Sequence, residues 1–172
     1  MSAEALKNLV TQIATIIDSH TLKCSSPPLT RSESLMKPED MVHTFEVTMT
    51  GGTWALSPTG FAYYPSPDIT GVIDSNKGPV SGGTHHTIKG RGFTHPNICD
   101  LRLRYGALEV IPSVLNGTAL SSVSPQVNVP DAVVIVPSGN GQNYGADLTL
   151  HYRDPENTFT YYQDVFVHSL HP

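Results

Sequence analysis

A spacing of 98 residues constrains this chain more than any other feature. Identical residues recur at that spacing near both ends of one segment: Leu22 and Leu120, Pro27 and Pro125, Phe61 and Phe159, and Tyr64 and Tyr162. A constant offset indicates an internal repeat. The same offset carries Met1 onto Cys99, so counterparts of residues 69–98 are missing from the first copy. We therefore expect the chain to begin in mid-domain.

Composition favours short strands over long helices. The 172 residues include 14 glycines and 14 prolines, and only 15% of the residues are charged. Such a composition is typical of an all-β protein. Short segments separated by Gly, Pro and Asn turns in the second copy predict seven strands. These are residues 69–73, 84–89, 100–105, 108–113, 133–136, 146–152 and 159–167.

The first copy is less regular. Isoleucine and threonine predict strands within residues 13–24, because β-branched side chains fit a pleated surface. Apolar residues at helical spacing leave a short helix open for residues 3–12. Residues 30–40 are expected to form a surface loop. Residues 44–50 alternate in polarity like a strand, with a turn at Gly51 and Gly52. Trp54 is expected in the core or at its rim, with an exposed contact as the alternative.

Two kinds of motif mark the second copy. Gly78-Pro79-Val80-Ser81-Gly82-Gly83-Thr84 and Ile88-Lys89-Gly90-Arg91-Gly92-Phe93 open it, and Phe159-Thr160-Tyr161-Tyr162 closes it. A similar tetrad, Phe61-Ala62-Tyr63-Tyr64, precedes the opening. Together these motifs resemble those of the IPT/TIG domain family. The resemblance implies a tandem of immunoglobulin-like β-sandwiches of the E-set/IPT type. Residues 1–65 would form the C-terminal part of one domain, residues 66–168 a complete domain, and residues 169–172 a tail.

The glycines of the opening motifs are expected to serve the fold. Gly90 and Gly92 permit backbone torsions that side chains resist, so Phe93 can swing over the end of the core. Gly82 and Gly83 predict a tight turn. No helix follows that turn, so it does not resemble a phosphate-binding loop.

The two cysteines bear on the cellular compartment. In extracellular relatives the resemblance implies a disulfide between positions like those of Cys99 and Cys24. However, the offset places Ser122 where the disulfide partner of Cys99 would be, and the partner of Cys24 would precede Met1. Unpaired thiols are typical of a reducing compartment, which predicts a cytoplasmic location with the cytoskeleton as one setting. A fragment of a secreted chain is the alternative. The tripeptide Asn116-Gly117-Thr118 fits a glycosylation site, but a hairpin turn is the preferred interpretation.

Charge and hydropathy argue against several partners. A net charge of −5 with ten scattered Lys and Arg residues offers no basic stripe for nucleic acid. No apolar run is long enough to insert into a membrane. The loop of residues 138–143 is polar and glycine-rich, so we expect a mobile hairpin tip where sandwich domains place contacts.

No constellation of residues indicates catalysis, so the sequence predicts a protein that is not an enzyme and has no catalytic, cofactor-binding or metal-binding residues. His85, His86 and His95 invite a metal interpretation, but adjacent residues of a strand point to opposite faces. The carboxylates of residues 154–157 lack the ligand spacing of a calcium loop, and a turn explains them better.

Function is therefore predicted from architecture. The leading hypothesis is a non-enzymatic structural and protein-interaction module, part of a tandem IPT/TIG array that acts as a scaffold in a larger assembly. The alternatives are a fragment of an extracellular receptor-type or adhesion array, and an accessory domain of a polysaccharide-processing enzyme. An incomplete first domain would expose strand edges, so the expected partners are proteins, one of which completes that domain with a strand.

Overall fold

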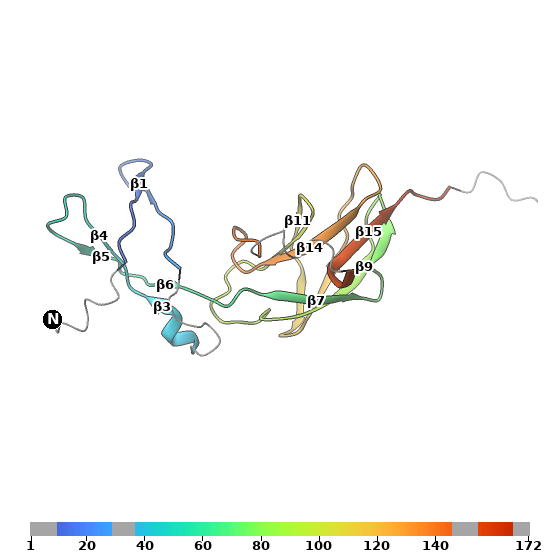
Figure 1. Cartoon of the computed structure of the whole chain (residues 1–172), viewed down its shortest axis with the longest axis horizontal. Helices are drawn as coiled ribbons and strands as arrows, with labels where there is room; N and C mark the ends of the chain where they lie inside the picture. Colours follow the sequence, from blue (N-terminus) through green and yellow to red (C-terminus); the bar gives the residue numbers. More distant parts are fainter. Residues whose placement is uncertain (1–9, 29–36, 146–154, 167–172) are drawn as a thin grey trace, which may run out of the picture. The chain divides into compact units, whose positions relative to one another are not determined.

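A computed structural model describes residues 10–28, 37–145 and 155–166 (Figure 1). The chain divides into two compact units, residues 1–35 and 36–172. The described residues form strands and two short 3-10 helices, η3 (Pro38–Met41) and η4 (Pro155–Asn157), which confirms the all-β class. The domain boundary expected at residues 65 and 66 stays a prediction.

Residues 68–162 build two sheets. The four-stranded sheet has the order β12 (Ser113–Asn116), β13 (Ala119–Val123), β9 (His85–Arg91) and β7 (Asp68–Ile73). The five-stranded sheet has the order β11 (Leu108–Val110), β10 (Arg102–Tyr105), β14 (Ala132–Ser138), β15 (Thr158–Tyr162) and β8 (Lys77–Pro79). All pairs are antiparallel except β15 with β8, which are parallel.

One hydrophobic core joins the two sheets. Strand β10 shows how the sequence creates it, because Leu103 and Tyr105 are buried whereas Arg102 and Arg104 alternate with them on the other face. Both sheets contribute residues, as expected of a two-layer, sandwich-like arrangement. The buried cluster comprises Ile69, Val80, Ile88, Phe93, Leu103, Tyr105, Leu120, Ile135, Phe159 and Tyr161.

The torsion expected of Gly90 and Gly92 is found at Gly92 and not at Gly90. Gly92 has a φ of +80°, which residues with a Cβ rarely adopt. Gly90 has no such torsion, but a Cβ there would meet the carbonyl oxygen of Asp68 and the ring of Phe93. Phe93 is buried in the core. One glycine therefore supplies a turn and the other a close backbone approach.

Residues 41–63 form a long, interrupted β-hairpin, here called the ribbon. At its base β3 (Val42–His43) pairs with β6 (Phe61–Ala62), and further along β4 (Glu46–Val47) pairs with β5 (Ala55–Leu56). Two backbone hydrogen bonds extend these ladders: Tyr63 N donates to Met41 O at 2.8 Å, and Ser57 N donates to Phe45 O at 2.9 Å.

The unit of residues 1–35 contains a smaller hairpin. Strand β1 (Thr15–Ile16) pairs antiparallel with β2 (Leu22–Lys23). Ile17 N donates to Thr21 O at 3.0 Å and so closes the turn. Within that turn Asp18 Oδ1 accepts a hydrogen bond from His20 N at 2.7 Å, and this bond is the largest cause that lowers the pKa of the Asp18 carboxyl.

Several predicted strands are confirmed. The strands expected at 69–73, 84–89 and 133–136 appear as β7, β9 and β14, and the one expected at 100–105 appears, shortened, as β10. The strands expected within residues 13–24 appear as the β1–β2 hairpin. The strand at 146–152 lies outside the described residues, as do residues 3–9 of the possible helix and most of the 30–40 loop.

Other predictions need correction. The single strand expected at 108–113 is wrong, because the chain divides there into β11 and β12 around Pro112, which has no backbone donor. The strand expected at 159–167 ends at Tyr162, and the one expected at 44–50 is reduced to β4. Strands β8 and β13 were not predicted, because short or serine-containing segments carry little apolar alternation.

Candidate interaction surface

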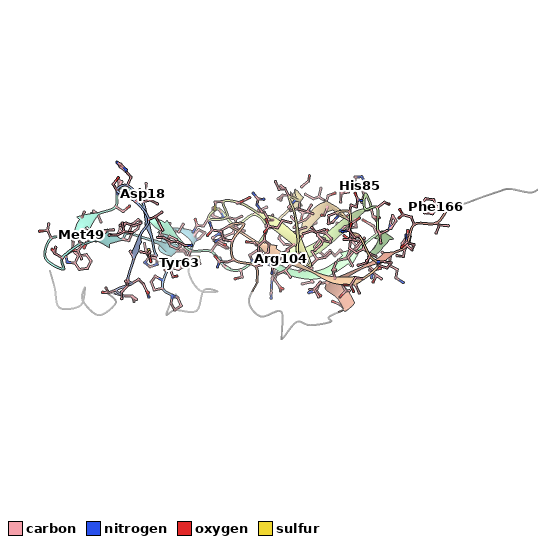
Figure 2. All side chains as sticks on the ribbon, turned by 90° about the horizontal axis from the view of Figure 1, so that it is seen from above. Asp18, Met49, Tyr63, His85, Arg104 and Phe166 are labelled. Atoms are coloured by element: carbon pink, nitrogen blue, oxygen red, sulfur yellow. The ribbon has the colours of Figure 1, made fainter. Side chains whose placement is uncertain are left out.

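The ribbon carries an unusual concentration of exposed apolar side chains. Met49, at its tip, is 73% exposed and is labelled in Figure 2. Large apolar side chains gathered on one exposed element are typical of contact surfaces. The exposed apolar residues of the ribbon are Val42, Phe45, Met49, Trp54, Leu56 and Phe61.

Trp54 does not lie in a core. It is 45% exposed, so of the preferred interpretation, core or rim, the core is wrong, and the alternative, an exposed contact, fits the structure. Among the described residues, the strands of the ribbon form two-stranded pairs that no third strand joins. An indole on a single two-stranded layer keeps one face in water.

The strand edges of the ribbon are also free. Within the described ranges, β3 pairs with β6 and β4 with β5, and no third strand joins either pair. A free edge presents a row of unpaired N–H and C=O groups, which is a template for another strand. A two-stranded hairpin alone is marginally stable in water. The ribbon therefore combines exposed apolar side chains with open hydrogen-bonding edges.

The base of the ribbon is well organised. The ring of Tyr63 makes edge-to-face contacts with His43 and Phe61, at centroid distances of 5.5 and 5.0 Å. Asn97 Nδ2 donates to Tyr63 O at 2.7 Å and to Pro38 O at 3.2 Å. These bonds hold the two chain ends of the ribbon together.

Phe61 and Phe159 are matched by the repeat but differ in environment. Each lies in a strand that pairs antiparallel with another, Phe61 opposite His43 and Phe159 opposite Val133. Phe159 is fully buried, with the rings of His86, Tyr105 and Tyr161 around it, whereas Phe61 is 45% exposed. Two phenylalanines at the offset of 98 residues therefore differ in burial: Phe159 is covered by other side chains, and Phe61 is partly open to solvent.

The β1–β2 hairpin matches the β12–β13 hairpin in its pairing. Thr15 pairs with Lys23 and Ile16 with Leu22, and 98 residues later Ser113 pairs with Ser121 and Val114 with Leu120. The two hairpins have the same register at the repeat offset. A one-residue slip would move every side chain to the other face, so this agreement is specific.

A chain of buried polar groups crosses the core of residues 68–162. His86 Nε2 lies 2.6 Å from the Tyr105 hydroxyl oxygen, which is 2.8 Å from Ser122 Oγ. His86 Nδ1 faces the Thr84 carbonyl oxygen at 3.1 Å, and because a carbonyl only accepts, Nδ1 carries a proton. In the neutral imidazole Nε2 is then the acceptor for the Tyr105 hydroxyl. Each group thus has a partner, as buried polar groups require.

Burial shifts the pKa of two members of this chain. It is the largest cause that lowers the pKa of His86, since the charged ring loses hydration. Burial likewise raises the pKa of Tyr105 far above its ordinary value. Both groups are therefore neutral near pH 7. A neutral chain of hydrogen bonds inside a core is a structural feature and offers no nucleophile to a substrate.

The histidines considered for a metal do not come together. His85 is exposed and His86 is buried, so the two rings lie on opposite faces of β9, as the sequence predicted. The Nδ1 atom of His95 accepts a hydrogen bond from Asn97 N at 3.2 Å. Among the residues that the structure describes, no three His, Cys, Asp or Glu side chains are arranged to hold a metal ion.

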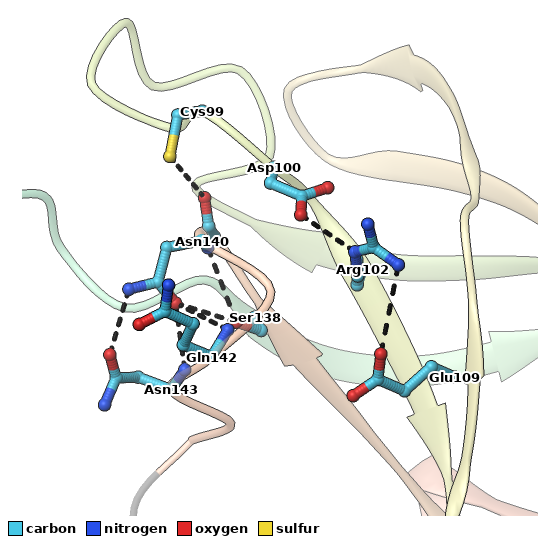
Figure 3. Close-up of polar contacts among 9 residues, drawn as sticks. Cys99, Asp100, Arg102, Glu109, Ser138, Asn140, Gln142 and Asn143 are labelled. Atoms are coloured by element: carbon cyan, nitrogen blue, oxygen red, sulfur yellow. Dashed lines mark hydrogen bonds and ion pairs between the residues drawn. The ribbon is translucent and has the colours of Figure 1, made fainter. Parts of the chain in front are cut away.

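Side-chain hydrogen bonds hold the loop of residues 138–143 (Figure 3). Asn140 Oδ1 accepts from Gln142 N at 3.0 Å and from Asn143 N at 2.9 Å, and Ser138 Oγ donates to it at 3.2 Å. Gly139 O accepts from Asp100 N at 3.1 Å. These contacts favour a closed loop organised by Asn140 over the open, mobile tip that we expected.

Charged residues continue from this loop across the outer face of the five-stranded sheet. Arg102 Nε donates to Asp100 Oδ2 at 2.8 Å, and Arg102 Nη1 lies 3.9 Å from Glu109 Oε2 (Figure 3). Asp100 is the largest cause that raises the pKa of Arg102. The Arg104 guanidinium lies 4.3 Å from the centre of the Tyr144 ring. Because both charge signs are paired locally, this face offers no single-sign field to a charged ligand.

The comparisons with known proteins leave the family open. No family model matches the chain, and no curated protein is significantly similar to it. Among the described residues, no helix is long and apolar enough to cross a bilayer. The IPT/TIG resemblance therefore stays a prediction.

The remaining sequence candidates have structural explanations. Cys24 and Cys99 are free thiols at exposed positions. Asn116 Oδ1 accepts hydrogen bonds from Thr118 N and Thr118 Oγ1, both at 2.9 Å, so the tripeptide forms the expected turn. Residues 155–157 form η4. Sequence reasoning did not identify the exposed apolar side chains of the ribbon as a contact surface. The signal for it was the match of Phe61 with Phe159 at the offset, in which Tyr161 has the counterpart Tyr63 but His86 has none in the sequence.

Proposed function

We propose that this chain is a non-enzymatic structural and protein-interaction module, built from an IPT/TIG-like, immunoglobulin-like sandwich and part of a preceding copy. The observation that carries the proposal is the contrast between Phe159, fully buried, and Phe61, 45% exposed at the matching position. Apolar surface of this kind is stabilised when a partner covers it. The partner is a protein in a larger assembly, for which this chain acts as a scaffold.

Strand order supports the immunoglobulin-like part of the proposal. Immunoglobulin sandwiches pair their strands in the orders ABED and CFG. If β7, β9, β12 and β13 are taken as A, B, D and E, the four-stranded sheet has the first of these orders. With β10, β14 and β15 as C, F and G, the five-stranded sheet contains the second.

The repeat is supported by hairpin geometry. The register of the β1–β2 hairpin recurs in β12–β13 at the offset of 98 residues. Two free, exposed thiols agree with a cytoplasmic setting, which we include in the proposal.

Site-specific photocross-linking in cells tests the proposed function. A photoreactive phenylalanine analogue replaces Trp54 or Phe61 on the ribbon, and a matched probe replaces Val129, which is 64% exposed outside the ribbon. We expect one reproducible protein adduct from both ribbon positions and none from the Val129 position. Equal adducts at all three positions, or no adduct at any, would contradict a scaffold that binds through the ribbon.

A further inference from the structure

The offset of 98 residues matches strand β2 with strand β13, and the edge of β13 that corresponds to the open edge of β2 is paired with another strand. That matched edge belongs to β13, which pairs with β12 on one side and with β9 on the other. On the β9 side, Leu120 lies opposite Ile88 and Ser122 lies opposite His86. The occupant is thus an antiparallel strand that places an apolar residue opposite the leucine.

The corresponding positions of β2 are open. Leu22 matches Leu120, and Cys24 matches Ser122, by the offset that also preserves the β1–β2 register. Leu120 is fully buried and Ser122 is 3% exposed, whereas Leu22 is 42% exposed and Cys24 is exposed. Within the described residues, β2 pairs with β1 alone.

We infer that the free edge of β2 binds an extended segment of a partner polypeptide, antiparallel and in the register that β9 adopts on β13. This inference rests on the proposed function, because it names one surface through which the module binds. The segment alternates inward-facing and outward-facing side chains as β9 does, and it places an apolar residue opposite Leu22. Backbone hydrogen bonds to the edge supply affinity, and the alternating side chains supply specificity.

A second copy of this chain does not supply that strand. Its own β9 is a central strand, paired with β13 on one side and with β7 on the other. Donating β9 would break both ladders and expose Ile88, which is fully buried. A segment that is extended and unpaired until it binds breaks no ladder and is the occupant that fits this edge.

Cys24 reports on the occupancy of this edge. Once a strand pairs with β2, a residue lies opposite Cys24 as His86 lies opposite Ser122, and it shields the thiol from the reagent. Cys99 is exposed and lies outside β2, so it serves as an internal control in the same molecule. Alkylation rates of the two thiols therefore separate docking at β2 from a general loss of accessibility.

The test measures the alkylation of both thiols in the full chain by mass spectrometry, with a synthetic peptide of residues 84–93 as the probe. A matched peptide carries Ile88→Asp. With the peptide at ten times its Kd, we expect Cys24 to react about tenfold more slowly and Cys99 to react at its usual rate. The Ile88→Asp peptide should not protect Cys24.

Three outcomes would overturn the inference. One is unchanged reactivity of Cys24 at every peptide concentration, and another is equal protection of both thiols. The third is protection of Cys24 in the chain alone as its concentration rises, which would make a second copy the occupant. The variant Leu22→Asp should abolish protection while Leu120 and the core stay intact. Adducts on the ribbon at Trp54 or Phe61 do not depend on β2, so a failure here is distinguishable from a failure of the proposed function.

Discussion

The imidazole of His86 and the phenol of Tyr105 are joined inside the core, with Nε2 and the hydroxyl oxygen 2.6 Å apart. Both side chains are buried, at 3% and 1% exposure, and their rings meet edge to face at a centroid distance of 5.8 Å. A neutral imidazole suits this place because burial disfavours the charged ring and a neutral Nε2 accepts from the Tyr105 hydroxyl. This relationship makes the core sensitive to pH.

Stability should fall as the pH is lowered through about 6.5, the pKa of a free imidazole. Burial lowers the pKa of His86 in the folded state, with a smaller contribution of the same sign from His85 and an opposing one from Asp74. The unfolded chain then binds the proton more tightly, so the free energy of unfolding decreases on acidification and levels off below the folded pKa. Urea midpoints between pH 7.5 and 5.5 measure this slope.

The variant His86→Gln should flatten that slope, whereas His85→Gln, on the exposed face of β9, should keep it. The glutamine variant should also be less stable at pH 7.5, by about 1–3 kcal/mol, because Tyr105 loses its buried partner. A slope that survives unchanged in His86→Gln would show that another group is responsible.

Alanine should have unequal effects at the two matched phenylalanines. Phe159→Ala removes a fully buried ring and should lower the free energy of unfolding by about 3–5 kcal/mol. Phe61→Ala removes a ring that is 45% exposed and should cost much less. Thermal unfolding of both variants makes the comparison. Equal losses would mean that Phe61 already has a cover in solution.

Gly90→Ala should be strongly destabilising, because the added Cβ meets the backbone carbonyl of Asp68 and the buried ring of Phe93. Overpacking of this kind costs about 1–3 kcal/mol, and more where backbone must move. Gly71→Ala, in the neighbouring strand β7, is the control, since its Cβ would have no heavy atom within 4 Å. Denaturant midpoints should separate the two variants clearly, and a tolerated Gly90→Ala would contradict the close approach.

Asn140→Ala should open the loop of residues 138–143. The substitution removes the oxygen that accepts from Gln142 N, Asn143 N and Ser138 Oγ. Amide hydrogen exchange at Gln142 and Asn143 should accelerate about tenfold, which corresponds to the loss of a hydrogen bond of about 1.4 kcal/mol. Asn140→Asp keeps the accepting oxygen and should retain most of the protection. Equal acceleration in both variants would assign the order to the backbone instead.

Local pattern was sufficient for much of residues 66–168. Short apolar segments bounded by turn residues predict the strands at 69–73 and 133–136. The glycine pair before Phe93 predicts the positive φ that Gly92 has, whereas the close approach at Gly90 depends on contacts with Asp68 and Phe93. Alternation also placed His85 and His86 on opposite faces, as the period of two requires.

Other features depend on contacts between distant segments. Ser122 and Tyr105 look unremarkable along the chain, and only the packing of β10 against β13 and β9 brings them to His86. Strand β8 has three residues and exists because β15 offers it a parallel edge.

The sequence by itself determined the all-β class, the offset of 98 residues and the positions of the turns, since these follow from periodicity and backbone preference. Only the tertiary structure decided which matched residues are covered. Phe61 and Phe159 are the same residue type in corresponding strands, and burial depends on what lies across from them. That is a property of the neighbouring strands, which no local pattern contains.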